Sequence, residues 1–452
     1  MSDHVFRRKF YDVMLEWKNT SNGKSALMID GARRIGKSTI AETFAQNEYD
    51  DYLLIDFVTA SKEIKDCFEN IGKIDEFFRL LFLYTGKTLV PGNTVIVFDE
   101  VQKFPLARQA IKYLVKDGRY HYIETGSLIS IKKTSREILI PSEECKRKMY
   151  PMDFEEFLWA TGDNVTADYI RECFEKRIAV GDSVHRKIMK TFRTYFAVGG
   201  MPQAVSAYVD GNTYKQIDDV KQNILSLYEE DLKKYDEDNL EKTSAIFKSI
   251  PEQLSNHNSK FKFSKIDGNA RYKNFVHSVK CIDESMIGNY CRNVTNPEIT
   301  LDLYADSSNF KLFMGDTGLL ISQIIRTADG SEDDLYKKII FGKIGANLGM
   351  VFENMVAQML RARGYDLFFH EFYYTPKNQK TEQRYEIDFL IVRKRCLTPI
   401  EVKSSSYKSH DSFDYFVKKY KQKKHERFII YTKDLFREDD ITYLPVYMTM
   451  CL

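Results

Sequence analysis

The segment GARRIGKS, from Gly31 to Ser38, restricts the fold of this chain more than any other feature of its sequence. It fits the pattern G-x-x-x-x-G-K-[ST] at every fixed position, and it lies between an apolar run, Ser25 to Ile29, and a stretch of helical pattern. A loop in this context turns its backbone N–H groups onto phosphate oxygens, and the N-terminus of the following helix also faces the anion. The sequence therefore predicts a P-loop unit that binds ATP and Mg²⁺.

Each fixed residue of this loop has an expected role. Gly31 and Gly36 let the backbone wrap closely around phosphate. Lys37 brings a positive charge to the β- and γ-phosphates, and the Ser38 hydroxyl ligates Mg²⁺. The residues expected to contact ATP are Gly31, Ala32, Arg33, Arg34, Ile35, Gly36, Lys37, Ser38 and Thr39.

Two further apolar runs end in polar residues suited to phosphoryl transfer. In TVIVFDEVQ, Asp99 at the strand tip is expected to hold Mg²⁺ through water, and Glu100 to orient or deprotonate the attacking water. The next run ends in ETGS, where Thr125 or Ser127 would lie beside the γ-phosphate as a polar sensor. We take Ser127 as the better candidate, although TGS is also ordinary turn chemistry.

The alternation of apolar runs and helical stretches predicts an α/β protein. In the first part, the runs Tyr52 to Phe57, Thr94 to Phe98 and His121 to Thr125 are separated by helical stretches, which implies crossovers and a parallel sheet. Helices dominate after Pro151, and from about residue 241 the order helix, turn, helix, hairpin suits a winged helix. We expect a P-loop core at 1–150, a helical lid at 151–240, a winged-helix-like segment at 241–330 and a second α/β domain at 331–452.

Composition excludes several other classes of protein. A chain of 452 residues is too long for one ordinary core, and a net charge of +2 restricts any nucleic-acid surface to a local patch. The seven cysteines are scattered without a C-x-x-C pair, which argues against a disulfide framework or a zinc site. The first residues lack an apolar signal core, and no stretch approaches the roughly 18 apolar residues of a membrane span. We expect a cytoplasmic protein without membrane contact.

The last domain carries its own candidate site. Asp388 lies in one predicted strand, and Glu401 and Lys403 share one face of the next. Asp388 and Glu401 are suited to hold Mg²⁺, with Glu353 on the preceding helix as a further ligand, and Lys403 to polarise the attacking water. The alternative is a same-face salt bridge between Glu401 and Lys403. The spacing resembles the PD-(D/E)xK nuclease pattern, with Ile387 in place of the proline.

Taken together, these segments resemble a known family. The chain is similar to the bacterial and archaeal ATPases of the AAA-like superfamily that carry a C-terminal domain of unknown function, DUF4143. The resemblance implies an additional-strand (ASCE) P-loop core, a helical lid, a winged helix and a restriction-endonuclease-like C-terminal domain. It also implies that Pro202 couples the lid to the nucleotide, whereas the simpler interpretation is a helix-ending Gly-Gly turn. The motifs are GARRIGKST at Gly31, VFDEVQ at Val97, YPMDFEEFLWA at Tyr150, VGGMPQAV at Val198, KLFMGDTGLL at Lys311, FENMVAQML at Phe352, EIDFLI at Glu386 and IEVKSS at Ile400.

The sequence thus favours an ATP-hydrolysing switch with a Mg²⁺-dependent nuclease-like domain that acts on DNA. Two alternatives remain open: a switch whose C-terminal domain only docks protein or DNA, and a sensor that responds to a protein partner. Arg136 and Arg147 are candidates for an arginine that acts on a neighbouring subunit of a homo-oligomer. A basic run interleaved with aromatic residues is suited to DNA phosphates and comprises Lys408, Lys418, Lys419, Lys421, Lys423 and Lys424.

Overall fold

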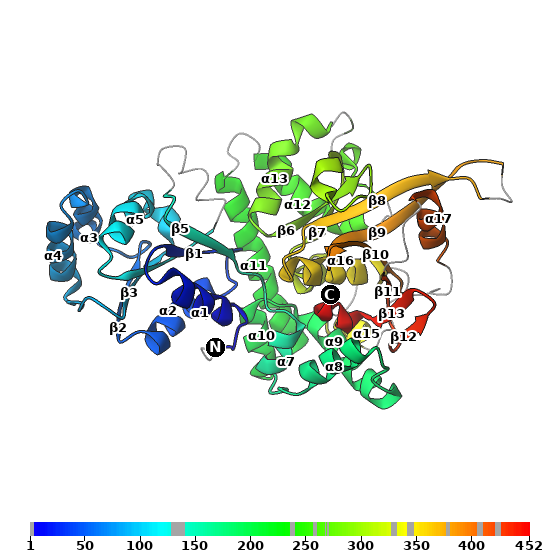
Figure 1. Cartoon of the computed structure of the whole chain (residues 1–452), viewed down its shortest axis with the longest axis horizontal. Helices are drawn as coiled ribbons and strands as arrows, with labels where there is room; N and C mark the ends of the chain where they lie inside the picture. The colour runs from blue at the N-terminus through cyan, green and yellow to red at the C-terminus, as the bar shows by residue number, and fades with distance from the viewer. Residues whose placement is uncertain are drawn as a thin grey trace. The chain divides into compact units, whose positions relative to one another are not determined.

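The computed structural model describes two compact units, His4–Tyr150 and Pro151–Leu452 (Figure 1). Within the part of the chain that is described, every helix is too short or too polar to span a lipid bilayer. The described residues are 4–127, 141–235, 240–255, 260–266, 268, 271–326, 332–340, 348–376, 380–404, 410–420 and 426–452.

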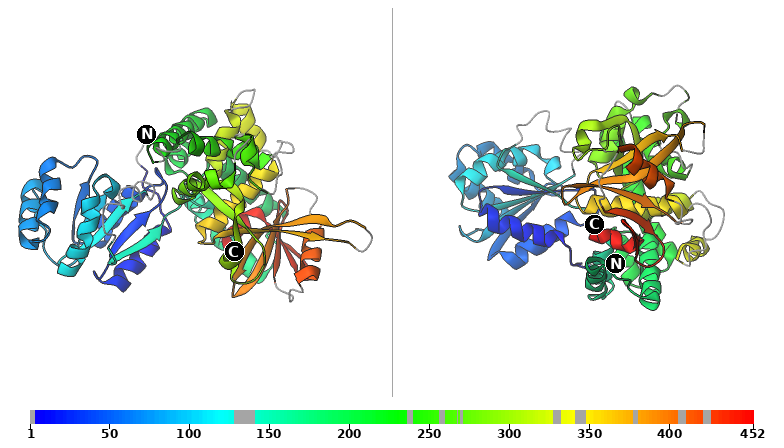
Figure 2. Two further views of the ribbon diagram at one scale, coloured as in Figure 1. Left: turned by 90° about the horizontal axis from the view of Figure 1, so that it is seen from above. Right: turned by 45° about the vertical axis from the view of Figure 1, so that its right-hand side comes forward.

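The N-terminal unit, blue to cyan in Figures 1 and 2, is built on one sheet of five parallel strands in the order β2-β3-β4-β1-β5. Strand β1 lies between β4 and β5, so the phosphate loop follows an interior strand of the sheet rather than an edge strand. This is the parallel P-loop architecture that the sequence predicts. The elements are α1 (Phe10–Ser21), β1 (Ala26–Asp30), α2 (Lys37–Glu48), β2 (Asp51–Asp56), α3 (Lys62–Asp66), α4 (Ile74–Thr85), β3 (Thr94–Asp99), α5 (Pro105–Asp117), β4 (His121–Gly126) and β5 (Glu144–Lys148).

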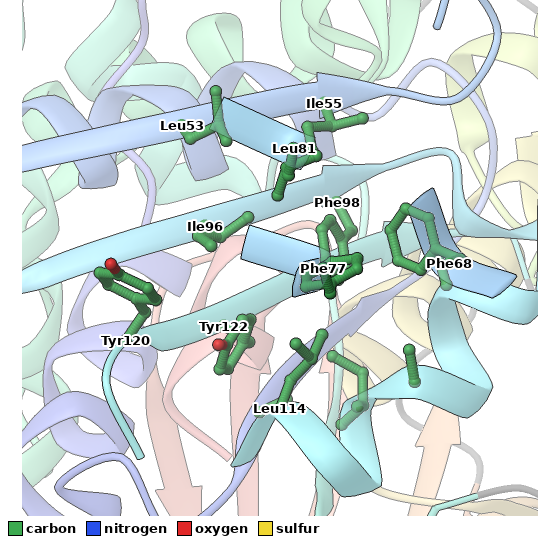
Figure 3. Close-up of a cluster of buried hydrophobic side chains, with 14 of the residues drawn as sticks. Leu53, Ile55, Phe68, Phe77, Leu81, Ile96, Phe98, Leu114, Tyr120 and Tyr122 are labelled. Atoms are coloured by element: carbon green, nitrogen blue, oxygen red, sulfur yellow. The ribbon is translucent and has the colours of Figure 1, made fainter. Parts of the chain in front are cut away.

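One face of this sheet is sealed by an aromatic core. Phe77 and Leu114, from α4 and α5, pack onto Phe98 and Tyr122 of the sheet, and all four side chains are buried (Figure 3). Burying each such side chain contributes roughly 1.5–3 kcal/mol. Packing of α4 and α5 on this face therefore holds β3 and β4, the strands that end at Asp99 and Gly126, in place.

The edge strand β5 is the one strand of this sheet that the sequence analysis missed. Its sequence, ECKRK, has no apolar alternation, and its last three residues are exposed. The strand is held by a buried ion pair instead. Arg108 of α5 donates through Nε and Nη2 to the two carboxylate oxygens of Glu144, both at 2.8 Å, and the two side chains are only 2% and 4% exposed.

The second unit begins with helices that pack around a glycine turn. Gly199 has φ 85°, and a Cβ there would lie 2.4 Å from the Asp316 carboxylate, so only glycine fits. Asp316 accepts the N–H of Gly200 at 2.6 Å, which joins the VGGMPQ and GDTGLL motifs. The helices are α7 (Phe154–Ala160), α8 (Thr166–Lys176), α9 (Asp182–Val198), α10 (Pro202–Val209), α11 (Tyr214–Tyr235), α12 (Leu240–Ser255), α13 (Val276–Glu284), α14 (Thr317–Ile325), α15 (Glu332–Ile340), α16 (Leu348–Ala362) and α17 (Asp411–Tyr420).

The same unit contains a mixed sheet of eight strands in the order β12-β13-β11-β10-β9-β8-β6-β7 (Figure 1). Helix α17 packs on one face of it, where Phe413 and Phe416 meet Ile387 and Ile429. Helix α16 contacts the sheet through β6, β7, β8 and β10. The strands are β6 (Gly288–Val294), β7 (Ala305–Met314), β8 (Leu367–Tyr374), β9 (Gln383–Arg393), β10 (Cys396–Val402), β11 (Arg427–Tyr431), β12 (Phe436–Glu438) and β13 (Ile441–Pro445).

This sheet contains strands from both sides of the predicted division at residue 330. The order helix, helix, hairpin within 241–330 is present as α12, α13, β6 and β7, but the hairpin does not stand apart as a wing. Strand β6 pairs in parallel with β8, with Cys291 opposite Leu367 and Asn293 opposite Phe369. The backbone N–H and C=O groups on the outer edge of β6 are bonded to β8, so the hairpin extends the sheet of the C-terminal domain.

Candidate functional site

The phosphate loop has the backbone that its sequence requires. Gly36 has φ 92° and Arg34 has φ 67°, both in the left-handed region. A Cβ on Gly31 would lie 2.5 Å from the carbonyl oxygen of Met149, so this position accepts only glycine. Helix α2 begins at Lys37, within the last residues of the loop, so its N-terminal backbone N–H groups face the place of an anion held by the loop.

Lys37 is placed inside the loop that it serves. Its ammonium donates to the carbonyl oxygens of Gly31 at 3.0 Å and Ala32 at 2.9 Å, and its side chain is 6% exposed. Burial lowers the pKa of Lys37, while the Glu100 and Asp30 carboxylates oppose that effect. Phosphate oxygens would supply stronger acceptors than these carbonyls. The Lys37 ammonium is therefore already positioned within the loop, where it can bind phosphate oxygens.

A line of hydrogen bonds joins the ends of three elements at the carboxyl edge of the sheet. Ser38 Oγ donates to Asp99 Oδ1 at 2.8 Å, and Thr125 Oγ1 donates to the same oxygen. The backbone N–H of Glu100 donates to Thr125 Oγ1 at 3.2 Å, and Gln102 Nε2 donates to the Glu100 carboxylate. The two acids predicted at the strand tip are thus connected to the phosphate loop.

Thr125, the other sensor candidate of the sequence analysis, belongs to this line of hydrogen bonds. Thr125 pairs with Ile29 in the sheet, and its hydroxyl lies between Asp99 and the backbone of Glu100. Ser127 follows the end of β4, and its sensor role stays a prediction. Glu100 itself has φ 53°, a left-handed conformation that costs a non-glycine residue about 1–2 kcal/mol.

Two residues of this site were missed from the sequence. Gln102 gave no signal apart from its place two residues after Glu100. Arg8, in the N-terminal segment, donates to the carbonyl oxygens of Ile35 at 2.8 Å and Tyr150 at 2.7 Å. Nothing in the sequence marks Arg8 out from Arg7, because its role depends on contacts 27 and 142 residues away.

The donor set at this edge fits a nucleotide-bound Mg²⁺. Ser38 Oγ and Asp99 Oδ1 lie 2.8 Å apart, and both are oxygen ligands of the kind that Mg²⁺ prefers. Asp30, which ends β1 immediately before the loop, is fully buried. Burial raises the pKa of Asp30 from 3.8 to about 6, against the effect of Lys146 and Lys37.

The remaining nucleotide-site predictions concern Pro202 and two arginines. Pro202 is the first residue of α10 in the second unit, and its contact with nucleotide stays a prediction. Arg147 lies on the exposed part of β5, and Arg136 lies outside the described residues. Neither arginine is assigned to a neighbouring subunit.

In the second unit, a pocket of about 300 Å³ gathers much of the predicted C-terminal site. Glu353 of α16, Asp388 of β9 and Lys403 line it. Phe368 pairs with Leu390 and His370 with Ile387, so β9 has one residue more than β8 at this point. A bulge of this kind re-aims side chains. Asp388 there accepts the backbone N–H of Val402 at 2.7 Å.

A lysine to which the sequence analysis gave no chemical role lies among these acids. Lys311 of β7 places its ammonium 2.6 Å from a Glu353 oxygen and 2.6 Å from a Glu386 oxygen. Its side chain is 8% exposed. Burial lowers the pKa of Lys311, but the Glu353 and Glu386 carboxylates more than compensate and hold it above its usual range.

The structure does not group the predicted metal ligands Glu353, Asp388 and Glu401 as a metal site would need, and their role as ligands stays a prediction. Among the described residues, no three His, Cys, Asp or Glu side chains are grouped so that they could hold a metal ion. Glu353 is paired with Lys311, and Glu401 is paired with Lys403 at 3.0 Å. Glu401 and Lys403 thus form the same-face salt bridge that was the alternative interpretation.

The basic helix α17 is partly described. Lys419 Nζ donates to the carbonyl oxygen of Tyr373 at 2.7 Å, and Lys418 lies 5.4 Å from the centre of the Tyr415 ring. Tyr415 stacks on Tyr374 with ring centres 4.7 Å apart. The other lysines of the predicted run, Lys408, Lys421, Lys423 and Lys424, lie outside the described residues.

Comparison with known proteins identifies three parts of the chain. Residues 23–158 match the AAA domain family, residues 189–329 match a domain of unknown function, DUF8612, and residues 348–448 match DUF4143. The predicted resemblance to AAA-like ATPases with a C-terminal DUF4143 domain is confirmed. The sequence matches no curated protein. One solved structure that aligns, the Thermotoga maritima RuvB Holliday junction branch migration motor, has 11% identity and a TM-score of 0.27, over 45% of this chain and 61% of that one.

Proposed function

We propose that this chain, in which an AAA-type P-loop domain precedes a DUF4143 domain, is an ATP-hydrolysing molecular switch. One observation carries the proposal. A line of hydrogen bonds runs from Ser38 through Asp99 and Thr125 to the backbone N–H of Glu100, and the Glu100 carboxylate, the candidate general base, accepts from Gln102 Nε2. A loop that only bound nucleotide would not need a carboxylate held beyond the magnesium ligands.

The roles of the residues follow from their positions. Ser38 and Asp99 would hold Mg²⁺, which when bound neutralises charge on the β- and γ-phosphates. Lys37 binds the same phosphates. Glu100 accepts the proton of the attacking water. Gln102 donates a hydrogen bond to the Glu100 carboxylate and so orients it.

The test separates binding from turnover. Glu100→Gln keeps the shape of the side chain but not its basicity, so we expect ATP affinity to stay within about threefold and turnover to fall by about 10²-fold or more. Lys37→Ala is the matched control, because it removes the charge that binds phosphate and should abolish ATP affinity. Phosphate release and binding of a fluorescent ATP analogue are measured on the same preparations. Normal turnover in Glu100→Gln would refute the general-base assignment.

For the C-terminal domain we favour a docking role over nuclease chemistry. The pocket that contains Glu353, Asp388 and Lys403 supports a nuclease as the second candidate. Against it, Lys311 and Lys403 already neutralise Glu353 and Glu401. We derive no step that uses a metal ion at this pocket.

We further propose DNA as the docked partner. Lys418 and Lys419, beside the stacked pair of Tyr374 and Tyr415, form a basic surface on α17 that suits a phosphate backbone. A cytoplasmic location agrees with seven scattered cysteines that include no C-x-x-C pair.

One assay tests this role. ATP turnover is measured with and without linear duplex DNA in Mg²⁺, while DNA integrity is followed in the same tubes. Stimulation with intact DNA supports docking. Cleavage that is lost in Asp388→Ala would establish the nuclease instead, and stimulation by a protein but not by DNA would shift the partner to protein. Gel filtration with ATP tests whether a homo-oligomer forms.

A further inference from the structure

The ammonium of Lys311 contacts Glu353, one of the predicted metal ligands, and Glu386, in the pocket that also contains Asp388. Lys311 belongs to β7, in the hairpin that adds to the edge of the sheet, whereas Glu353 and Glu386 come from α16 and β9. All three line one pocket together with Asp388. The charge thus comes from an element outside the predicted set of strands.

We infer that Lys311 takes the place of a divalent cation among these carboxylates, so that the pocket is held together without metal and gains a metal site only when Lys311 is removed. The inference rests on the proposed docking role of the domain, and the experiment below separates the two.

The contacts of the ammonium support this exchange. Two of its three donors are accounted for by Glu353 and Glu386, each at 2.6 Å, a distance typical of a strong charge-assisted bond. A divalent ion would need its own oxygen ligands at roughly 2.0–2.6 Å. The ammonium is held near the Phe369 ring at 5.3 Å, and the side chain is buried, so it cannot swing into solvent without leaving both acids.

Two further acids near the pocket, Glu401 and Asp388, also have partners within the protein. Lys403 lies 3.0 Å from Glu401, whose side chain is only 2% exposed. Asp388 accepts the backbone N–H of Val402. One oxygen of each acid that a metal would need therefore already lies next to a lysine ammonium or an N–H group.

The experiment measures binding of Mn²⁺ alone to the full chain without nucleotide, by the loss of the free-Mn²⁺ electron paramagnetic resonance signal. All proteins carry Ser38→Ala, which removes the hydroxyl ligand of the phosphate loop. We expect Lys311→Met to gain one Mn²⁺ site per chain, with affinity at least tenfold above the parent. Adding Asp388→Asn should remove the gain, and Lys311→Arg, which keeps the charge, should show none.

A second variant guards against a folding defect. Lys311→Met/Glu386→Gln removes one cation and one carboxylate, so the net charge of the pocket is unchanged, and its gain of Mn²⁺ should be smaller than that of Lys311→Met because one carboxylate ligand is lost. Two results would overturn the inference: a parent protein that binds one Mn²⁺ lost on Asp388→Asn, or a folded Lys311→Met protein with no gain. DNA cleavage by the wild type would instead count against the docking role, and absent ATP turnover against the switch.

Discussion

Replacing Thr125 by valine tests whether the hydrogen-bond line at the sheet edge supports catalysis. Valine has nearly the shape of threonine, so the packing of β4 against β1 is kept while the hydroxyl is lost. That hydroxyl donates to the Asp99 carboxylate and accepts the N–H of Glu100. A hydrogen bond to a charged group contributes about 1.5–3 kcal/mol. Because 1.36 kcal/mol corresponds to a factor of ten in rate, a loss of about 2 kcal/mol in the transition state predicts about 30-fold slower turnover.

The assay is steady-state phosphate release at saturating ATP, with affinity measured separately. Thr125 does not belong to the phosphate loop, so the affinity of Thr125→Val for ATP should stay within about threefold, while kcat falls. Thr125→Ser keeps the hydroxyl and should recover at least a third of the wild-type rate. Ser127→Ala is the competing variant.

Two results would refute the reasoning. If Thr125→Val turns over ATP at the wild-type rate, the line from Asp99 to Glu100 is not needed for catalysis. If Ser127→Ala is instead the slow variant, the sensor is Ser127, and the contacts of Thr125 only stabilise the strand end.

The remaining predictions concern buried charges of the N-terminal unit. The free energy of unfolding is measured by urea unfolding, with the fluorescence of Trp17 as the signal, in proteins that carry Trp159→Phe. The folded-state pKa of Asp30, about 6 against 3.8, means that its stabilising contribution is complete below pH 3.8 and is lost as the pH rises through 6. Asp30→Asn should therefore be more stable than the parent at pH 8, by at most about 3 kcal/mol, and equal pH profiles would contradict this. Arg108→Met leaves Glu144 buried without its cation and should cost about 3–5 kcal/mol, whereas a Met pair at both positions should recover more than half; an additive double variant would contradict the pairing.

Much of the structure of the N-terminal unit could be predicted from short segments of the sequence. The predicted strands Thr94 to Phe98 and His121 to Thr125 differ from β3 and β4 by one residue at one end, since a buried parallel strand is a continuous apolar run. The phosphate loop is equally local, because its function depends on glycine conformations within eight residues. Such features need no knowledge of the rest of the chain.

Features that depend on distant partners were not predictable in the same way. Strand β5 is a row of charged residues that forms an edge strand because Arg108, 36 residues earlier, buries Glu144. The hairpin β6–β7 has the order of a winged helix, and only its pairing with β8 assigns it to the C-terminal sheet. In both cases the local pattern permits more than one structure, and a long-range contact selects among them.

The C-terminal pocket illustrates the same limit at the level of chemistry. Asp388, Glu401 and Lys403 could be identified from strand periodicity, and the pattern correctly predicts that Glu401 and Lys403 share a face. Periodicity contains no information on the charge that faces those acids. That charge is Lys311, which is 42 residues before Glu353 and belongs to a motif whose letters suggest only a strand and a helix. A pattern of acids predicts where a cation is needed, and the fold decides whether the cation is a metal ion or a lysine of the same chain.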